Sequence, residues 1–269
     1  MHQIAFNLGP LTVHWYGIMV ALGYLASVFA MLRLKENAGL DTEQVFDLSM
    51  ITIVAGLLGS RIFYVIQFWS RDGFADNFFL IFRIDKGGLV FYGGFICALA
   101  GIWIYCRRKK FSVLKVMDMM APALAAGHAF GRIGCFLQGC CFGKPTELPW
   151  AVFFPQGTLP ASRFPDLSSG DSCSVGIHPV QIYESLSNFA IFGILFALSG
   201  RMKPGRIAAT YLIAYGVMRF IWEFFRGDHT DFAFQTFTPS QTISLFFVIP
   251  LGIILFIFLG RRKDVAKGA

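Results

Sequence analysis

Charged residues are scarce in this sequence. Asp, Glu, Lys and Arg make up 14% of its 269 residues, whereas about a quarter is usual for soluble domains. Hydrophobic residues account for 55% of the chain, with 31 Phe among the aromatic residues, and the mean hydropathy is +0.60. This composition excludes an ordinary soluble domain and predicts a polytopic membrane protein.

Several common sequence signals are also missing. The first dozen residues have no basic segment, so we expect no cleavable signal peptide. We find no tandem repeat, no inverted repeat of the transporter kind and no G-x-S-x-G nucleophile elbow. The six cysteines have neither CxxC spacing nor a following pair of histidines, so we predict no metal site.

The apolar residues are gathered into long runs. A spanning helix needs about 20 mainly apolar residues. Seven segments meet this requirement, namely 12–32, 45–69, 88–106, 116–137, 179–199, 207–225 and 239–260. We therefore predict an all-α fold, a single integral-membrane domain over residues 1–269 with about seven transmembrane helices.

The net charge of +7 does not indicate a nucleic-acid partner, because the basic residues stand at the ends of the apolar runs. Fourteen of the 23 Lys and Arg residues lie in one set of loops and six in the opposite set. The positive-inside rule places the richer set in the cytoplasm, with the N-terminus outside and the C-terminus inside. The stretch 138–178, rich in Pro, Gly and Ser, is then expected to form a small extracytoplasmic head.

The remaining three basic residues, Arg61, Arg132 and Arg219, fall inside apolar segments. A charge at the bilayer centre costs about 3 kcal/mol and usually marks a functional site. Arg132 follows His128 by one helical turn, and Gly131 and Gly134 flank it, which permits close approach of a backbone or a lipid. The alternative is a structural arginine bonded to backbone carbonyls, with the glycines serving helix packing.

The sixth segment carries Arg219, Glu223 and Arg226 on one helical face. Glu223 is able to hold one arginine and leave the other for a ligand, although a self-contained ion pair is the alternative. With Arg61 as a third arginine at membrane level, the set suits a phosphate, which guanidinium groups bind bidentately. A phospholipid headgroup is the phosphate available at this depth, so membrane lipid is the expected partner.

Three further motifs stand at the starts of apolar segments. Gln181 and Glu184 share one helical face at the start of the fifth apolar segment. The alternative is that Glu184 only stabilises the helix N-terminus, where a carboxylate is favourable. His14 and Tyr16 begin the first, where interfacial aromatic residues are common. Tyr92 lies between two Gly pairs at the start of the third, which indicates a bent or closely approached backbone presenting a hydroxyl; a simple interfacial aromatic is the alternative.

Cys140, Cys141 and Cys173 lie on the predicted outer side, where disulfides persist. A bridge from Cys173 to one of the pair is one hypothesis, and three unpaired thiols are the other.

Taken in order, these motifs resemble the prolipoprotein diacylglyceryl transferase family over essentially the whole chain. The shared motifs are His14-Trp-Tyr-Gly17, Gly59-Ser-Arg61, Gly87-Gly-Leu-Val-Phe-Tyr-Gly-Gly94, Gly131-Arg-Ile-Gly134, His178-Pro-Val-Gln-Ile-Tyr-Glu184, Tyr215-Gly-Val-Met-Arg-Phe-Ile-Trp-Glu-Phe-Phe-Arg226 and Pro239-Ser-Gln241. Each motif alone is weak, but their joint order and spacing are specific.

The resemblance implies transfer of diacylglyceryl from phosphatidylglycerol to the lipobox cysteine of a prolipoprotein signal peptide, with glycerol 1-phosphate leaving. It implies no metal or organic cofactor and a location in the bacterial cytoplasmic (inner) membrane. It also implies that Arg132 and Arg219 bind the phosphate and that Tyr16 is a functional residue. Cys135 and Cys140 stand where many members have Asn and Glu, and Tyr92 stands where some have a proposed histidine base, so those roles do not carry over.

We accordingly expect Arg132, Arg219 and Tyr92 to be catalytic. The expected substrate-binding residues are His14, Tyr16, Arg61, Gly131, Gly134, Gln181, Glu184, Glu223 and Arg226. The arginines are expected to neutralise the leaving phosphoester, and Tyr92 to act as base or to orient the glycerol or the thiol. A phospholipid or anion transporter, and an acyltransferase built on His128 and a carboxylate, are the rival functions.

Overall fold

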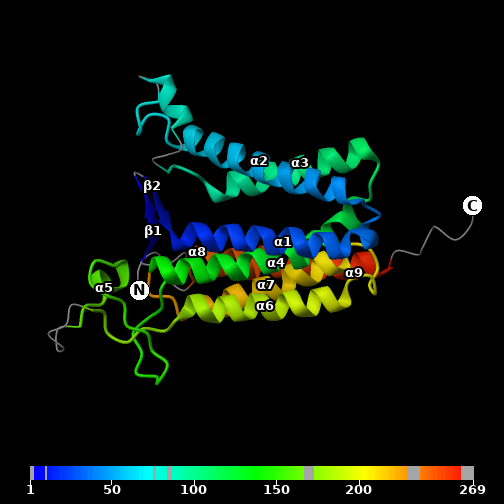
Figure 1. Ribbon diagram of the computed structural model, residues 1–269. Helices are drawn as coiled ribbons and strands as arrows, with labels where there is room; N and C mark the ends of the chain where they lie inside the picture. The colour runs from blue at the N-terminus through cyan, green and yellow to red at the C-terminus, as the bar shows by residue number, and fades with distance from the viewer. Residues whose placement is uncertain are drawn as a thin grey trace, which may run out of the picture. The chain divides into compact units, whose positions relative to one another are not determined.

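The computed structural model describes residues 3–9, 11–74, 77–83, 87–166, 173–228 and 237–261. Helices dominate this part of the chain (Figure 1). The long ones are α1 (Trp15–Ala38), α2 (Thr42–Gln67), α3 (Phe91–Lys109), α4 (Val113–Gln138), α6 (Val180–Leu198) and α7 (Arg206–Glu223). A last run joins α8 (Pro239–Ile243), the π-helical turn η3 (Ser244–Val248) and α9 (Ile249–Arg261).

A helix therefore occupies each of the seven predicted segments. Four of them, α1, α2, α6 and the run Pro239–Arg261, are long and apolar enough to cross a membrane by length and composition. This confirms the predicted all-α, polytopic membrane class. The number of spans stays a prediction.

The chain divides into two compact units, Leu32–Val116 and Met1–Met31 with Met117–Ala269. In the first unit, α2 and α3 pack closely because glycines line their contact. A Cβ atom on Gly59 would overlap Cys97, and one on Gly93 would overlap Phe63. The α2 N-terminus is closed by a reciprocal cap between Asp41 and Gln44. The expected close approach at the Gly93-Gly94 pair is thus confirmed.

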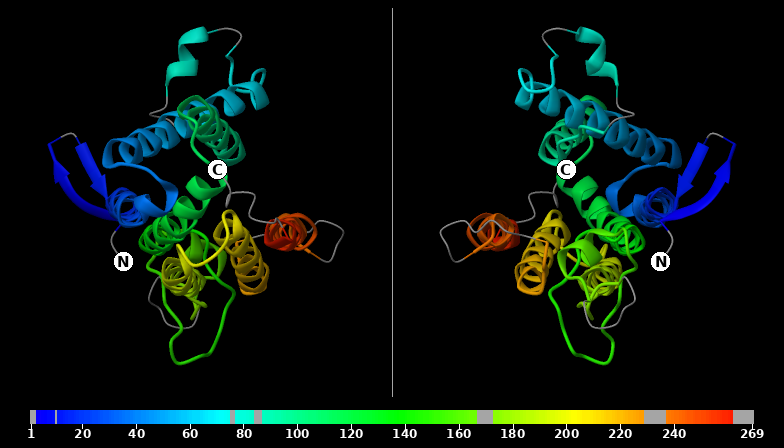
Figure 2. Two further views of the ribbon diagram at one scale, coloured as in Figure 1. Left: turned by 90° about the vertical axis from the view of Figure 1, so that its right-hand side faces the viewer. Right: turned by 90° about the vertical axis from the view of Figure 1, so that its left-hand side faces the viewer.

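The second unit is a bundle of α1, α4, α6, α7 and the α8–η3–α9 run, seen nearly end-on in Figure 2. Gly127 of α4 packs against Ser27 of α1, whose hydroxyl donates to the carbonyl of Ala123 at 2.8 Å. Asp118 of α4 accepts from the backbone N–H groups of Gly205 (2.6 Å) and Ala208 (2.8 Å) at the start of α7. These contacts fix α4, which carries Arg132, against two neighbouring helices.

A short hairpin precedes α1 and was not predicted. Strands β1 (Ile4–Leu8) and β2 (Leu11–His14) pair antiparallel, and Gly9 takes a positive φ of 60° between them. The first helix consequently begins at Trp15, and the expected start at residue 12 is wrong. Hydropathy alone does not separate an apolar strand from the start of an apolar helix, which explains the error.

The stretch 138–178 contains only one short helix among its described residues, α5 (Leu159–Arg163). It is held together by isolated β-bridges and by a small core of Phe142, Phe154 and Ile177. Its location outside the membrane stays a prediction. Lys86, Arg262, Lys263 and Lys267, which were counted for the orientation, lie outside the described residues.

Candidate functional site

Three arginines and three carboxylates form one connected ion-pair cluster in the bundle of α4, α6 and α7. Glu184 near the start of α6 is its centre and is 1% exposed. Its Oε2 lies 2.7 Å from Nε of Arg132, and its Oε1 lies 3.3 Å from Nη1 of Arg219. One carboxylate therefore holds two guanidinium groups that come from different helices.

Glu223 joins this cluster to the last helical run. Its Oε2 lies 2.9 Å from Nη2 of Arg219 and 3.8 Å from Nε of Arg226. Its Oε1 accepts from the hydroxyl of Thr238 at 2.8 Å, and the same Thr238 caps the N-terminus of α8. The predicted pairing of Glu223 with Arg219 is present, but Glu223 lies between both arginines and does not leave one of them free.

Arg226 is held within the cluster by Asp228. Its Nε and Nη2 donate to the two carboxylate oxygens of Asp228 at 2.9 and 2.7 Å. Burial alone would lower the pKa of Arg226, but the hydrogen bonds and charge of Asp228 raise this pKa above its usual value. Arg226 stays cationic, with its fork directed at Asp228.

Arg132 differs from the other two arginines in one respect. Its Nε faces Glu184 and lies 3.4 Å from Nε2 of His128, which confirms that His128 and Arg132 share a helical face. Among the described residues, its Nη1 and Nη2 atoms donate no hydrogen bond. A Cβ atom on the adjacent Gly131 would meet nothing within 4 Å. The side chain is 12% exposed, and its terminal N–H groups are left to donate to an anion.

Arg61, and not Arg132, is the arginine that binds backbone carbonyls. The five N–H donors of Arg61 bind the carbonyls of Leu80, Ile81, Arg83, Gly87 and Gly88 at 2.6 to 3.1 Å. Gly87 and Gly88 have φ values of 82° and 78°, which bend the backbone toward the guanidinium. A direct contact between Arg61 and a ligand would require breaking one of these bonds.

The predicted tyrosines and His14 are exposed. Tyr92 lies in the first turn of α3 and is 59% exposed, in the same unit as Arg61. Tyr16 begins α1 beside Gly134, where a Cβ atom would lie 3.1 Å from the tyrosine ring. Because residue 134 is a glycine, the ring of Tyr16 packs against α4, the helix that carries Arg132. The joint action of Tyr92 with the arginine cluster stays a prediction.

Gln181 is buried one turn before Glu184 on α6, so the predicted shared face is confirmed. Its Nε2 donates to the carbonyl of Cys140 at 2.8 Å. Its Oε1 is buried and has no partner among the described residues. The side chain therefore fixes the loop after α4 and keeps one acceptor unused.

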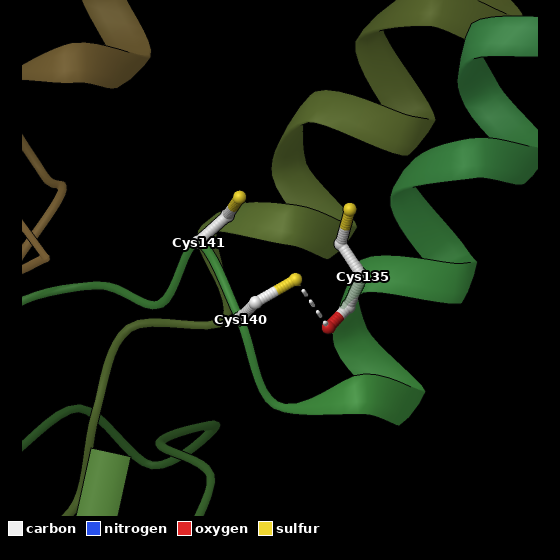
Figure 3. A group of neighbouring side chains, drawn as sticks. All are labelled: Cys135, Cys140 and Cys141. Atoms are coloured by element: carbon white, nitrogen blue, oxygen red, sulfur yellow. Dashed lines mark hydrogen bonds between the residues drawn. The ribbon is translucent and has the colours of Figure 1, made fainter. Parts of the chain in front are cut away.

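Cys135, Cys140 and Cys141 lie together where α4 ends (Figure 3). Their three Sγ atoms are within 4.8 Å of one another. The sequence singled out these three cysteines, but their lack of CxxC spacing argued against a metal site, and the contact between their sulfur atoms was not predicted. The signal that could have found it is Gly139, whose positive φ of 76° turns the chain back over the last turn of α4.

All six cysteines are free thiols, so the hypothesised disulfide to Cys173 is not formed. Cys173 pairs with Pro155 in an isolated β-bridge, while Cys140 and Cys141 face Cys135. Hydrogen bonds from the thiols of Cys135 and Cys140, followed by the positive charges of Arg226 and Arg132, lower the pKa of Cys141.

Fold and site together define a helical membrane protein with a buried arginine–carboxylate cluster and one guanidinium edge open to an anionic ligand.

Comparisons with known proteins show which family of membrane proteins the chain resembles. The family model described as prolipoprotein diacylglyceryl transferase matches residues 3–258. The chain is 36% identical to the phosphatidylglycerol–prolipoprotein diacylglyceryl transferase of Clostridium tetani, over 98% of this chain and 100% of that protein. The similarly named proteins of Finegoldia magna and Chromobacterium violaceum are 32% and 34% identical, over 99% and 97% of this chain and 98% and 96% of theirs.

The chain belongs to the prolipoprotein diacylglyceryl transferase family. This confirms the resemblance carried by the ordered motifs. The transporter alternative finds no support in the relatives.

Proposed function

We propose that this protein transfers the diacylglyceryl group of phosphatidylglycerol to the lipobox cysteine thiol of a prolipoprotein signal peptide. The products are a thioether and glycerol 1-phosphate. Family membership supports the reaction class, and the names of the relatives support both substrates. The open terminal edge of Arg132, held in place by a buried carboxylate, is the observation that carries the assignment of the phosphate site.

Arg132 contributes its free Nη atoms to the phosphate, which a guanidinium binds in a bidentate fork. Arg219 lies on the other side of Glu184 and completes the positive site. When the glycerol C–O bond breaks, the electron pair moves to the phosphoester oxygen, and both arginines stabilise the charge that develops there. The substrate sulfur forms the new C–S bond and loses its proton. Tyr92 serves as base or orients the glycerol or the thiol.

The remaining site residues hold this arrangement in place. Glu184 and Glu223 orient the two phosphate arginines, and Arg226 keeps Glu223 neutralised. Arg61 fixes the bend before α3 and thereby positions Tyr92. Gln181 offers a buried acceptor to a substrate hydroxyl. His14, Tyr16, Gly131 and Gly134 line the approach to Arg132.

The protein lies in the bacterial inner membrane with its N-terminus outside and its C-terminus in the cytoplasm. The stretch 138–178 then forms a head on the extracytoplasmic side. Within this stretch, Gly143 forms a β-bridge with Arg226, three residues beyond the end of α7. The head is thus connected to the same cluster that binds the phosphate.

A reconstituted assay tests the function. Purified protein in detergent, labelled phosphatidylglycerol and a lipobox peptide should yield lipidated peptide with release of glycerol 1-phosphate. A peptide with the lipobox Cys replaced by Ala serves as the control and should not react. Absence of product with the Cys peptide, or equal labelling of both peptides, contradicts the proposal.

A further inference from the structure

The proposed phosphate site does not account for the three-cysteine cluster. Cys135 lies in the last turn of α4, and its carbonyl accepts from the backbone N–H groups of Gly139 (3.0 Å) and Cys140 (3.1 Å). Gln181 holds the Cys140 carbonyl at 2.8 Å. Several contacts that do not involve sulfur therefore place the three thiols side by side.

Cys141 adds a second, independent sign of a built site. Its φ is 57°, a left-handed conformation that side-chain-bearing residues seldom adopt. Of the described non-glycine residues, Lys110 alone shares it, as the C-cap of α3. At Cys141 this conformation brings the third sulfur within 4.8 Å of the other two (Figure 3). Strained backbone of this kind is often found at ligand sites.

The sulfur spacing suits one metal ion. A zinc–sulfur bond of about 2.3 Å places tetrahedral thiolate ligands roughly 3.8 Å apart. The observed sulfur atoms lie within 4.8 Å of one another, so shifts of about 1 Å or less bring them to this spacing. Three thiolates select soft or borderline ions such as zinc. Three protein ligands with one open position are the pattern of catalytic zinc sites.

The cluster also adjoins the proposed phosphate site. Cys135 follows Arg132 by three residues on α4, so the two lie on one helical face. Gly143, two residues after Cys141, forms a β-bridge with Arg226. A group bound at the three thiols would therefore lie beside the guanidinium that is open to an anion.

We propose that Cys135, Cys140 and Cys141 bind one zinc-class ion, whose fourth position accepts the incoming thiolate. The identity of that thiol, the lipobox cysteine, rests on the proposed function. Coordination releases the thiol proton to water. The metal-bound thiolate attacks the glycerol carbon and forms the C–S bond, while the C–O bond breaks with its electron pair on the phosphate oxygen. This chain then differs from what the family resemblance implies, because it carries thiols where many members have amide and carboxylate.

Metal binding is measured on the purified protein, independently of transfer. The metal-free protein should bind one equivalent of zinc, and cobalt(II) should produce a thiolate-to-metal charge-transfer band. Cys135→Ser and Cys141→Ser should weaken zinc binding more than about 10-fold. Cys173→Ser, a cysteine outside the cluster, should match the parent. Comparable melting temperatures among the variants show that a loss of binding is not a loss of fold.

The cobalt band then tests the open position. Addition of the lipobox Cys peptide should strengthen the band, and the matching Ser peptide should leave it unchanged. Binding below one equivalent, or equal affinity in the cluster variants and Cys173→Ser, overturns the site. If the cobalt charge-transfer band does not change when the Cys peptide is added, the proposed coordination of the peptide thiolate is wrong. Failure of transfer in a protein that binds metal and peptide contradicts the proposed function instead.

Discussion

The substitution Glu184→Gln removes one charge from the centre of the arginine cluster and keeps the shape of the side chain. Glu184 is 1% exposed and pairs with Arg132 at 2.7 Å and Arg219 at 3.3 Å. Without its charge, Arg132 loses its carboxylate partner and Arg219 keeps only Glu223. Removing one partner of a buried pair costs about 3–5 kcal/mol. The same loss frees Arg132 to move, and a displacement of about 1 Å in a positioning group costs about 100-fold in rate.

We therefore expect Glu184→Gln to lower the melting temperature by about 6 °C or more and kcat/KM by about 100-fold. Thermal denaturation in detergent and the labelled-lipid transfer assay measure the two effects. Glu147→Gln is the matched control, because Glu147 is exposed and makes no ion pair among the described residues. If Glu184→Gln behaves like Glu147→Gln in both assays, the buried carboxylate does not hold the arginines and the reasoning fails.

Three other residues give separate predictions. Tyr92→Phe should lower kcat/KM by about 100-fold in the transfer assay if the hydroxyl is the base, and full activity excludes that role. Gly88→Ala should reduce the free energy of unfolding by about 1–3 kcal/mol, because its φ is 78° and a Cβ atom would overlap Arg61; Gly193→Ala, at an open helical position, should not. Burial lowers the pKa of His178, so the unfolded chain binds this proton more readily and thermal stability should fall as pH drops below about 6.5. His178→Asn should flatten that pH profile, and an unchanged profile contradicts the assignment.

The fold was largely predictable because hydropathy dominates a membrane protein. Apolar runs of spanning length gave the helices, and the ends were misjudged where charged or strand-forming residues adjoin them. The helix α1, expected over 12–32, runs over Trp15–Ala38. Its polar last turns carry no hydropathy signal, and the preceding hairpin is as apolar as a helix start.

The site was predictable where its residues share one helix. The spacing of Arg219 and Glu223 placed them on one face of α7. Arg226, predicted on the same face, lies three residues beyond the end of α7 but still approaches Glu223. The pairing of Arg132 with Glu184 joins two helices across 52 positions, so no local pattern indicates it. The sequence also could not show that Arg61 binds backbone carbonyls while Arg132 does not, because this depends on which carbonyls the folded loop presents.

The central claim is that the open edge of Arg132 binds the phosphate of the lipid substrate. The direct test is the transfer rate of Arg132→Ala with labelled phosphatidylglycerol and a lipobox peptide, compared with Arg108→Ala at an exposed position of α3. Loss of one charge-stabilising donor predicts a fall in turnover of about 100- to 1000-fold for Arg132→Ala, with Arg108→Ala unchanged. Parent-like turnover in a folded Arg132→Ala protein would contradict the account.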